Sequence, residues 1–175
     1  QSKRFLMTTA VLILFPTVFF FVCDLKNLSA GKRLLAAVFQ SETTRTAGFN
    51  TINISKMSEA SKAVMIMLML IGGSPGSTAG GMKTTPFTVL ILNAIATFRS
   101  KEYVGAFGRR LEYPVIKNAA TIAMLYFNLF FLGGIAISVY EGLPLLDCLY
   151  EAASAVGTVG LTLGITPGLH VISQT

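Results

Sequence analysis

The chain has 175 residues, of which 53% are hydrophobic and 13% charged, and its formal net charge is +6. Soluble domains usually carry about 25% charged residues, so the composition indicates a membrane protein and excludes an ordinary soluble domain. The basic residues are scattered and do not interleave with aromatic residues, which gives nucleic-acid binding no support. Two cysteines in apolar surroundings indicate neither a disulfide framework nor a metal site, and a single histidine argues against most metal and triad chemistry.

The first predicted membrane span covers residues 5–23. Its centre, Leu6–Val22, has 17 residues without a charge, and as a helix it is about 26 Å long, which just reaches the thickness of the hydrocarbon layer. A secretory signal peptide is the alternative, because two basic residues precede the apolar run. The span is preferred because Asp24–Lys26 is a poor cleavage site. Pro16 is expected to kink this helix.

Two short apolar helices are predicted at residues 31–43 and 144–156, and each is too short to cross a bilayer. Each is followed by a loop with a Thr-x-Gly motif, at residues 44–50 and 157–162. The two motifs lie 112 positions apart, and such internal repetition indicates a repeated structural unit. The candidate ion-binding residues are Thr46, Ala47, Gly48 and Phe49 in the first copy and Thr158, Val159, Gly160 and Leu161 in the second.

The Thr-x-Gly motif is similar to the Thr-Val-Gly of a K⁺-channel filter, where backbone carbonyls replace the hydration shell of the ion. Glycine is needed because the carbonyls align only if some residues adopt dihedrals that a Cβ disfavours. Each loop has one such glycine, which predicts weaker discrimination between K⁺ and Na⁺ than a filter with two. Glu42 and Arg45 flank the first loop, and either they pair with each other or Arg45 faces the outer vestibule.

Residues 58–98 are predicted to form one membrane span that is broken in the middle. Ser58 is the expected N-cap, and the two apolar halves, Ala63–Ile71 and Phe87–Phe98, are each too short to cross. Irregular backbone at membrane depth is tolerated only where it faces protein or a water-filled cavity, so the break, residues 72–85, predicts a gate in a transport pathway. The predicted gate residues are Gly72, Gly73, Ser74, Pro75, Gly76, Ser77, Thr78, Ala79, Gly80, Gly81 and Lys83.

Two enzymatic interpretations of this break fail, and no enzymatic activity is expected. A phosphate-binding loop is excluded because Met82 separates Gly81 from Lys83 and no strand pattern precedes it. A nucleophile elbow is excluded because Pro75 lacks the N–H that an oxyanion hole would use, and His170 has no evident acidic partner. A rigid packing kink is the remaining alternative to a gate.

Residues 99–117 carry five basic and two acidic residues, which predicts a cytoplasmic loop. A further span at residues 118–140 then leads outward to the second short helix. This order predicts one complete unit in residues 1–98 and an incomplete second unit in residues 118–175, with both loops facing outward. The chain is therefore expected to be a piece of a larger protein.

Two stretches, Thr44–Thr51 and Ile71–Lys83, resemble the Trk/Ktr/HKT superfamily of cation transporters, and the chain is most similar to its bacterial Ktr/Trk potassium-uptake membrane subunits. The resemblance implies an all-α integral membrane protein of repeated units, each with a membrane helix, a pore helix, a filter loop and a second membrane helix, as in K⁺ channels. It places the third unit and most of the fourth in this chain. It also implies that Gly48 and Gly160 are the filter glycines and that the Gly-rich break is an intramembrane gate.

The resemblance further implies K⁺ as the transported ion, in some members with Na⁺, and no organic cofactor. It implies a homodimer in the cell membrane, surrounded by lipid, with a cytoplasmic nucleotide-binding regulatory ring. The basic loop at residues 99–117 is a reasonable docking surface for that ring, and the alternative is that its charge serves only as a topology signal. A secondary transporter with broken helices that hold an anionic solute is the alternative. The repeated short helix and Thr-x-Gly motif favour the channel-like protein.

Overall fold

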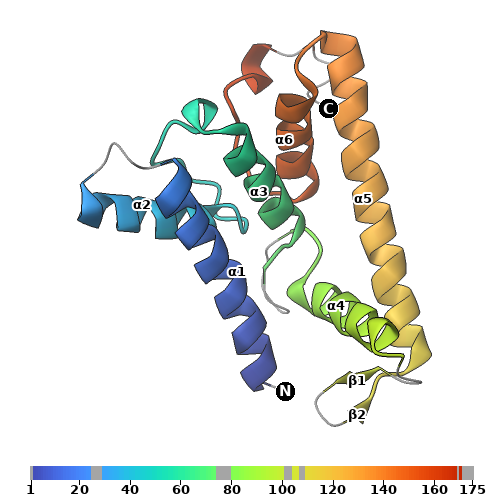
Figure 1. Ribbon diagram of the computed structural model, residues 1–175. Helices are drawn as coiled ribbons and strands as arrows, with labels where there is room; N and C mark the ends of the chain where they lie inside the picture. Colours follow the sequence, from blue (N-terminus) through green and yellow to red (C-terminus); the bar gives the residue numbers. More distant parts are fainter. Residues whose placement is uncertain are drawn as a thin grey trace.

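The computed structural model describes residues 2–24, 29–73, 80–100, 104–106, 109–168 and 170. This part of the chain contains the six α-helices α1 to α6, two short 3₁₀ helices and a small two-stranded ribbon (Figure 1). The described fold is therefore helical apart from the ribbon, as the sequence predicts for a membrane protein.

Helix α1 (Ser2–Cys23) packs against the shorter helix α2 (Ala30–Thr43). Pro16 lies inside α1 and its side chain is buried. Arg33 of α2 lies over the Phe21 ring at 4.3 Å, and its Nε donates a 2.6 Å hydrogen bond to the Phe21 carbonyl. This bond satisfies a carbonyl in the last turn of α1 that lacks a partner within its helix.

The predicted broken span corresponds to two helices, α3 (Glu59–Leu70) and α4 (Thr84–Phe98), which follow one another from the upper to the lower half of Figure 1. Ser58 caps α3, since its hydroxyl accepts a 3.3 Å hydrogen bond from the Ser61 N–H. The Asp24 carboxylate at the end of α1 accepts a 2.9 Å bond from the Ser58 N–H and another from the Ser61 hydroxyl. The end of α1 is thus fixed to the start of α3.

Helix α5 (Tyr113–Glu141) has 29 residues, and within the described residues it is the one helix long and apolar enough to cross a membrane. Thr8–Cys23 and Thr84–Phe98 are shorter apolar helices. Large apolar side chains along α5, such as Leu132 and Val139, are exposed, as expected of a helix that faces lipid. The helix begins before residue 118 because Pro114 suits its first turn, so the end of the predicted basic loop is helical.

The basic segment before α5 contains the ribbon, formed by β1 (Gly105–Ala106) and β2 (Arg109–Arg110) as an antiparallel pair. A 2.9 Å hydrogen bond from the Leu111 N–H to the Val104 carbonyl extends it. The ribbon lies at the end of α5 that is opposite to α6 (Figure 1). The basic residues are therefore at the far side of the molecule from the second short helix.

Helix α6 (Leu145–Val156) runs back alongside α5 after a tight connection. Gly142 ends α5 in the left-handed conformation, with φ +66°, and its N–H donates to the Ser138 carbonyl. Gly134 allows α5 and α6 to approach closely, because a Cβ there would lie 2.5 Å from Leu149 Cδ2 and 3.2 Å from Leu149 Cα. The packing of α6 therefore depends on a small residue in α5.

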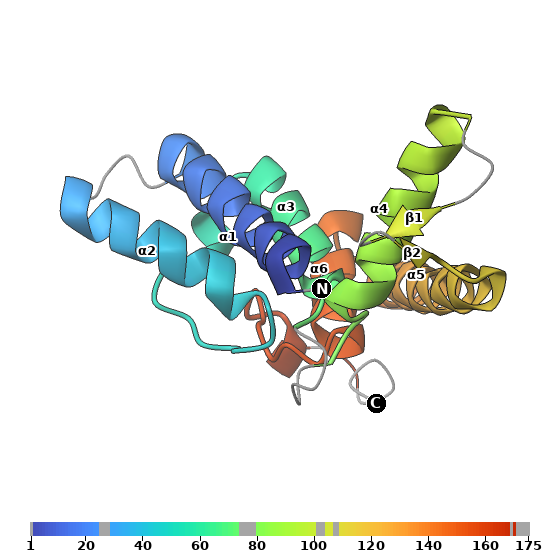
Figure 2. The ribbon, with the colours of Figure 1, turned by 90° about the horizontal axis from the view of Figure 1, so that it is seen from below.

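The hydrophobic core lies where α6 and α3 meet α1 and α2. Figure 2 shows α6 at the centre, with α1, α2 and α3 on one side and α4 and α5 on the other. Its largest fully buried apolar side chains are Phe20, Met65, Met69, Tyr150 and Leu161. Leu161 belongs to the second Thr-x-Gly loop, so this loop is anchored in the core.

Candidate functional site: two filter-like loops and the break in the span

The first loop (residues 44–50) follows the C-terminus of α2 and is held by Thr43. The Thr43 hydroxyl donates a 2.6 Å hydrogen bond to the Phe49 carbonyl and accepts a 2.9 Å bond from the Phe49 N–H. Thr46 and Gly48 both have φ +75°. A threonine in the left-handed region is strained, and it is found where the surrounding structure holds it.

The second loop (residues 157–162) follows α6 and has the same alternation of backbone conformation. Thr158 has φ +51° and Gly160 has φ +87°, which are the positions equivalent to Thr46 and Gly48. Val159 and Leu161 are buried, whereas Thr158 and Gly160 are exposed. Because φ changes sign from one residue to the next, the orientation of successive peptide groups differs from that in a helix or in a strand.

The two loops lie in contact, although they are far apart in the sequence. A Cβ on Gly48 would overlap the Val159 carbonyl oxygen and lie 3.7 Å from Gly160 Cα. Among the described residues, none donates a hydrogen bond to the carbonyls of residues 46–48 or 158–160. The contact therefore brings together two short stretches of backbone whose carbonyl oxygens are free to bind another partner.

The ends of the break in the span are held together by backbone pairing. Ile71 and Met82 form a parallel bridge, with hydrogen bonds from the Gly72 N–H to the Met82 carbonyl (2.8 Å) and from the Met82 N–H to the Leu70 carbonyl (3.1 Å). A third bond, of 3.3 Å, joins the Thr84 N–H to the Gly73 carbonyl. The gate residues Ser74, Pro75, Gly76, Ser77, Thr78 and Ala79 lie outside the described residues.

The break and the second loop are in direct contact. A Cβ on Gly80 would overlap Thr158 Oγ1 and would lie 2.7 Å from the Gly157 carbonyl oxygen. A Cβ on Gly157 would in turn lie 2.6 Å from the Met69 carbonyl oxygen, at the end of α3. Glycines at positions 80 and 157 therefore allow the backbone of the break to pack directly against the second loop.

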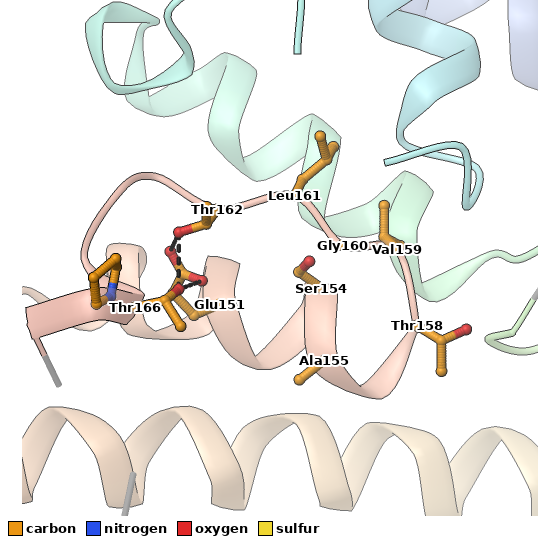
Figure 3. A pocket seen from close by; sticks show the side chains of 10 residues that line it. Glu151, Ser154, Ala155, Thr158, Val159, Gly160, Leu161, Thr162 and Thr166 are labelled. Atoms are coloured by element: carbon orange, nitrogen blue, oxygen red, sulfur yellow. Dashed lines mark hydrogen bonds between the residues drawn. The ribbon is translucent and has the colours of Figure 1, made fainter. Parts of the chain in front are cut away.

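A cavity of about 530 Å³ lies beside the second loop and is lined by residues of α6, of the loop and of the segment that follows it. Figure 3 shows Glu151 of α6 pointing to Thr162 and Thr166 at one end of this cavity, with Thr158 at the other end. The Glu151 carboxylate accepts hydrogen bonds of 2.8 Å from both hydroxyl groups. The cavity therefore contains polar groups at both of its ends.

The charged groups near the two short helices form one salt bridge between described residues. Lys62 Nζ of α3 lies 2.9 Å from Asp147 Oδ1 in the first turn of α6, and the side chains are 12% and 26% exposed. Glu42 and Arg45 form no such pair, so the structure does not support their proposed pairing. Arg45 Nε is buried and has no hydrogen-bond partner in the described part of the chain.

Four side chains that hold these loops or link the helices around them were not singled out as site residues from the sequence. Thr43 and Glu151 hold the loops, whereas Asp24 and Lys62 link helices. Each acts on a residue that is distant in the chain or on a returning loop, so no motif marks it. The described residues also contain no group of three or more His, Cys, Asp or Glu side chains that could hold a metal ion. Free backbone carbonyls are thus the groups at this site that are suited to a monovalent cation.

The family model of the TrkH cation transport proteins matches residues 5–175 of this chain. The chain belongs to the TrkH cation transport protein family. The Ktr system potassium uptake protein B of Bacillus subtilis is 39% identical over 83% of this chain and 33% of the relative. The potassium/sodium uptake protein NtpJ of Enterococcus hirae is 36% identical over 99% of this chain and 41% of the relative.

A third relative of this TrkH family chain is the Ktr system potassium uptake protein B of Vibrio alginolyticus, which is 32% identical over 98% of this chain and 40% of the relative. The chain thus spans between 33% and 41% of the length of these relatives. The match confirms the family resemblance seen in Thr44–Thr51 and Ile71–Lys83.

Proposed function

We propose that this chain is part of a pore-forming subunit for potassium uptake across the cell membrane, in which backbone carbonyls of the two loops select the ion. The observation that carries the proposal is the contact between two stretches of backbone, residues 46–48 and 158–160, whose carbonyls receive no hydrogen bond from the described residues. A backbone carbonyl without a partner in the chain can accept a hydrogen bond from water or bind a cation. A dehydrated cation is the partner expected in a filter.

The backbone conformations and the short helices support this proposal. Positive φ values at Thr46, Gly48, Thr158 and Gly160 alternate with negative ones in both loops, as carbonyl alignment requires. Helices α2 and α6 end directly before these loops, so the partial negative charge at their C-termini favours a cation there. In this proposal α1, α2, the first loop and α3–α4 form one unit, and α5, α6 and the second loop begin the next.

The names of the relatives support K⁺ as the ion, with Na⁺ as a second ion that such a path admits. One glycine in each loop is consistent with modest discrimination between the two. The Phe49 carbonyl is turned to the Thr43 hydroxyl, so the inclusion of Phe49 and Leu161 in the filter stays a prediction. In this proposal the ion meets the carbonyls of residues 46–48 and 158–160.

We infer that the break between α3 and α4 acts as a gate beside the filter. Two observations support this. The break contacts the second loop directly at Gly80, and three backbone hydrogen bonds join the two ends of the break. The proposal concerns the break as a whole, residues 72–85.

The orientation and the assembly of the protein are proposed from charge and from the names of the relatives. The basic segment before α5 is placed in the cytoplasm and the two loops face outward. Because two relatives are named as proteins of a Ktr system, we propose a homodimer that binds a cytoplasmic nucleotide-binding regulatory ring. Residues 99–112 are the surface proposed for that contact.

Uptake of ⁸⁶Rb⁺ into liposomes that contain the full-length transporter tests this function, with K⁺ and Na⁺ as competitors. Gly160→Ser is the informative variant, because nothing lies within 4 Å of its Cβ position and its φ is +87°. The change therefore acts through the backbone, at a cost of about 1–2 kcal/mol for a left-handed residue. We expect strong uptake that K⁺ blocks, and a loss of K⁺ over Na⁺ discrimination in the variant.

Gly142→Ser is the matched control, since Gly142 also has positive φ (+66°) and open space but lies in the connection between α5 and α6. It should lower stability to a similar degree and leave discrimination unchanged. Absence of cation flux from well-folded protein would contradict the proposal and would favour a transporter of anionic solutes.

A further inference from the structure

Glu151 is a charged residue with little exposure to solvent, in the middle of α6. It is 9% exposed, and it lies more than one turn before the end of the helix. A carboxylate at such a position is costly unless hydrogen bonds satisfy it. Its partners therefore indicate what the carboxylate does.

All of the hydrogen-bond partners of the Glu151 carboxylate among the described residues belong to the segment that follows the second loop. Oε1 accepts bonds of 2.8 Å from the Thr162 hydroxyl and from the Leu163 N–H, and Oε2 accepts a bond of 2.8 Å from the Thr166 hydroxyl. The two hydroxyl groups are also 2.8 Å apart. One side chain thus fixes three residues of this segment (Figure 3).

The network continues from Thr162 toward the rest of the loop. The Thr162 hydroxyl accepts a 2.9 Å bond from the Gly164 N–H, which fixes the turn after the second loop. On the other side, the chain passes from Thr162 to Leu161, whose side chain is 2% exposed. The residues directly after Gly160 are therefore held by a buried side chain and by Glu151.

The first loop is held by a different kind of group. There the neutral hydroxyl of Thr43 pairs with both backbone groups of Phe49. Hydrogen bonds to a carboxylate are about twice as strong as those between neutral groups. The second loop thus has a stronger restraint on its outer end than the first.

We infer that Glu151 is a positioning residue for ion selection, which holds the outer end of the second loop so that the carbonyls of residues 158–160 keep their spacing. The inference rests on the proposed function of the loops. Glu151 acts through hydrogen bonds to Thr162, Leu163 and Thr166 and not by attracting the ion with its charge. Both carboxylate oxygens are already occupied by donors from the chain.

Two substitutions separate positioning from charge. In Glu151→Gln the amide oxygen can still accept from Thr162 and Leu163, and the amide NH₂ can donate to the Thr166 oxygen, while the charge is lost. In Glu151→Ala the charge and all three bonds are lost. Competition of K⁺ and Na⁺ with ⁸⁶Rb⁺ uptake, measured in liposomes with the full-length transporter, gives the discrimination of each variant.

We expect Glu151→Ala to lower the discrimination between K⁺ and Na⁺ on the order of tenfold, the equivalent of one charge-assisted hydrogen bond. Glu151→Gln should keep most of the wild-type discrimination. Glu59→Ala is the control, because Glu59 is an exposed glutamate in the first turn of α3. It should behave like the wild type.

Equal losses in Glu151→Gln and Glu151→Ala would overturn the inference in favour of a charge effect, and wild-type discrimination in Glu151→Ala would overturn it outright. If Glu151→Ala does not fold, Thr166→Val removes the bond to Oε2 and the contact with the Thr162 hydroxyl but keeps the two bonds to Oε1, and it should lower discrimination without loss of folded protein. Absence of flux in the wild type would instead count against the proposed function.

Discussion

The close packing of α5 on α6 allows a test with two adjacent glycines. Gly134→Ala places a Cβ 3.2 Å from Leu149 Cα and 2.5 Å from Leu149 Cδ2. The leucine side chain can rotate, but its Cα moves only with the helix, so α6 must shift by a few tenths of an ångström. At Gly133 the nearest atom is Ala152 Cβ at 3.9 Å, an ordinary contact. The two positions thus have the same backbone and different surroundings.

The expected magnitudes follow from these contacts. Replacing a helical glycine by alanine stabilises a helix by roughly 0.5–1 kcal/mol, and Gly133→Ala should show this gain. Overpacking costs about 1–3 kcal/mol, so Gly134→Ala should be less stable than Gly133→Ala by about that amount. Because α6 leads into the second loop, Gly134→Ala should also lower ⁸⁶Rb⁺ uptake.

Thermal unfolding of the full-length protein in detergent measures the difference between the two variants, and uptake into liposomes measures its effect on the loop. Equal unfolding temperatures for Gly133→Ala and Gly134→Ala would refute the reasoning, because they would mean that α5 and α6 are not in close contact at Gly134. Lower stability with unchanged uptake would refute only the link from the position of α6 to the loop.

Two further predictions concern contacts between elements. A double-mutant cycle with Lys62→Ala and Asp147→Ala measures how strongly this ion pair contributes to the free energy of unfolding. We expect a coupling energy of about 1–2 kcal/mol, between the values for exposed and buried ion pairs. A coupling energy near zero would mean that the 2.9 Å contact does not contribute to stability. Gly80→Ala should reduce ⁸⁶Rb⁺ uptake, because its Cβ would displace Thr158 at a cost of about 1–3 kcal/mol, whereas Gly31→Ala, where nothing lies within 4 Å, should not. Equal uptake in these two variants would show that the break does not press on the second loop.

The positions of the short helices could be predicted from the sequence because their signals are local. An apolar segment bounded by polar residues predicts residues 31–43, and α2 is found at Ala30–Thr43. Pro144 and Gly157 bound the second segment, and α6 is found at Leu145–Val156. The start of α5 could not be placed as well, because Pro114 suits both a loop and the first turn of a helix.

The side chains that hold the second loop and link α3 to α6 could not be predicted, because their contacts depend on how the chain turns back in space. Glu151 meets Thr162 and Thr166 only because the chain turns back along α6 after Gly160, where φ is +87°. Lys62 and Asp147 are far apart in the sequence and meet only when α3 packs on α6. Sequence periodicity describes each helix separately and contains no information about such pairs.

The contact between Gly48 and Val159 also has a consequence for the biosynthesis of the protein. The ribosome adds about 5–20 residues each second, so the first loop is synthesised roughly 6–22 s before its neighbour. During this time α3, α4 and α5 are made while the first loop lacks the backbone that it contacts. The proposed filter is therefore completed only when the second loop has been made, and a translational pause in this interval would affect the proposed ion path more than the helices around it.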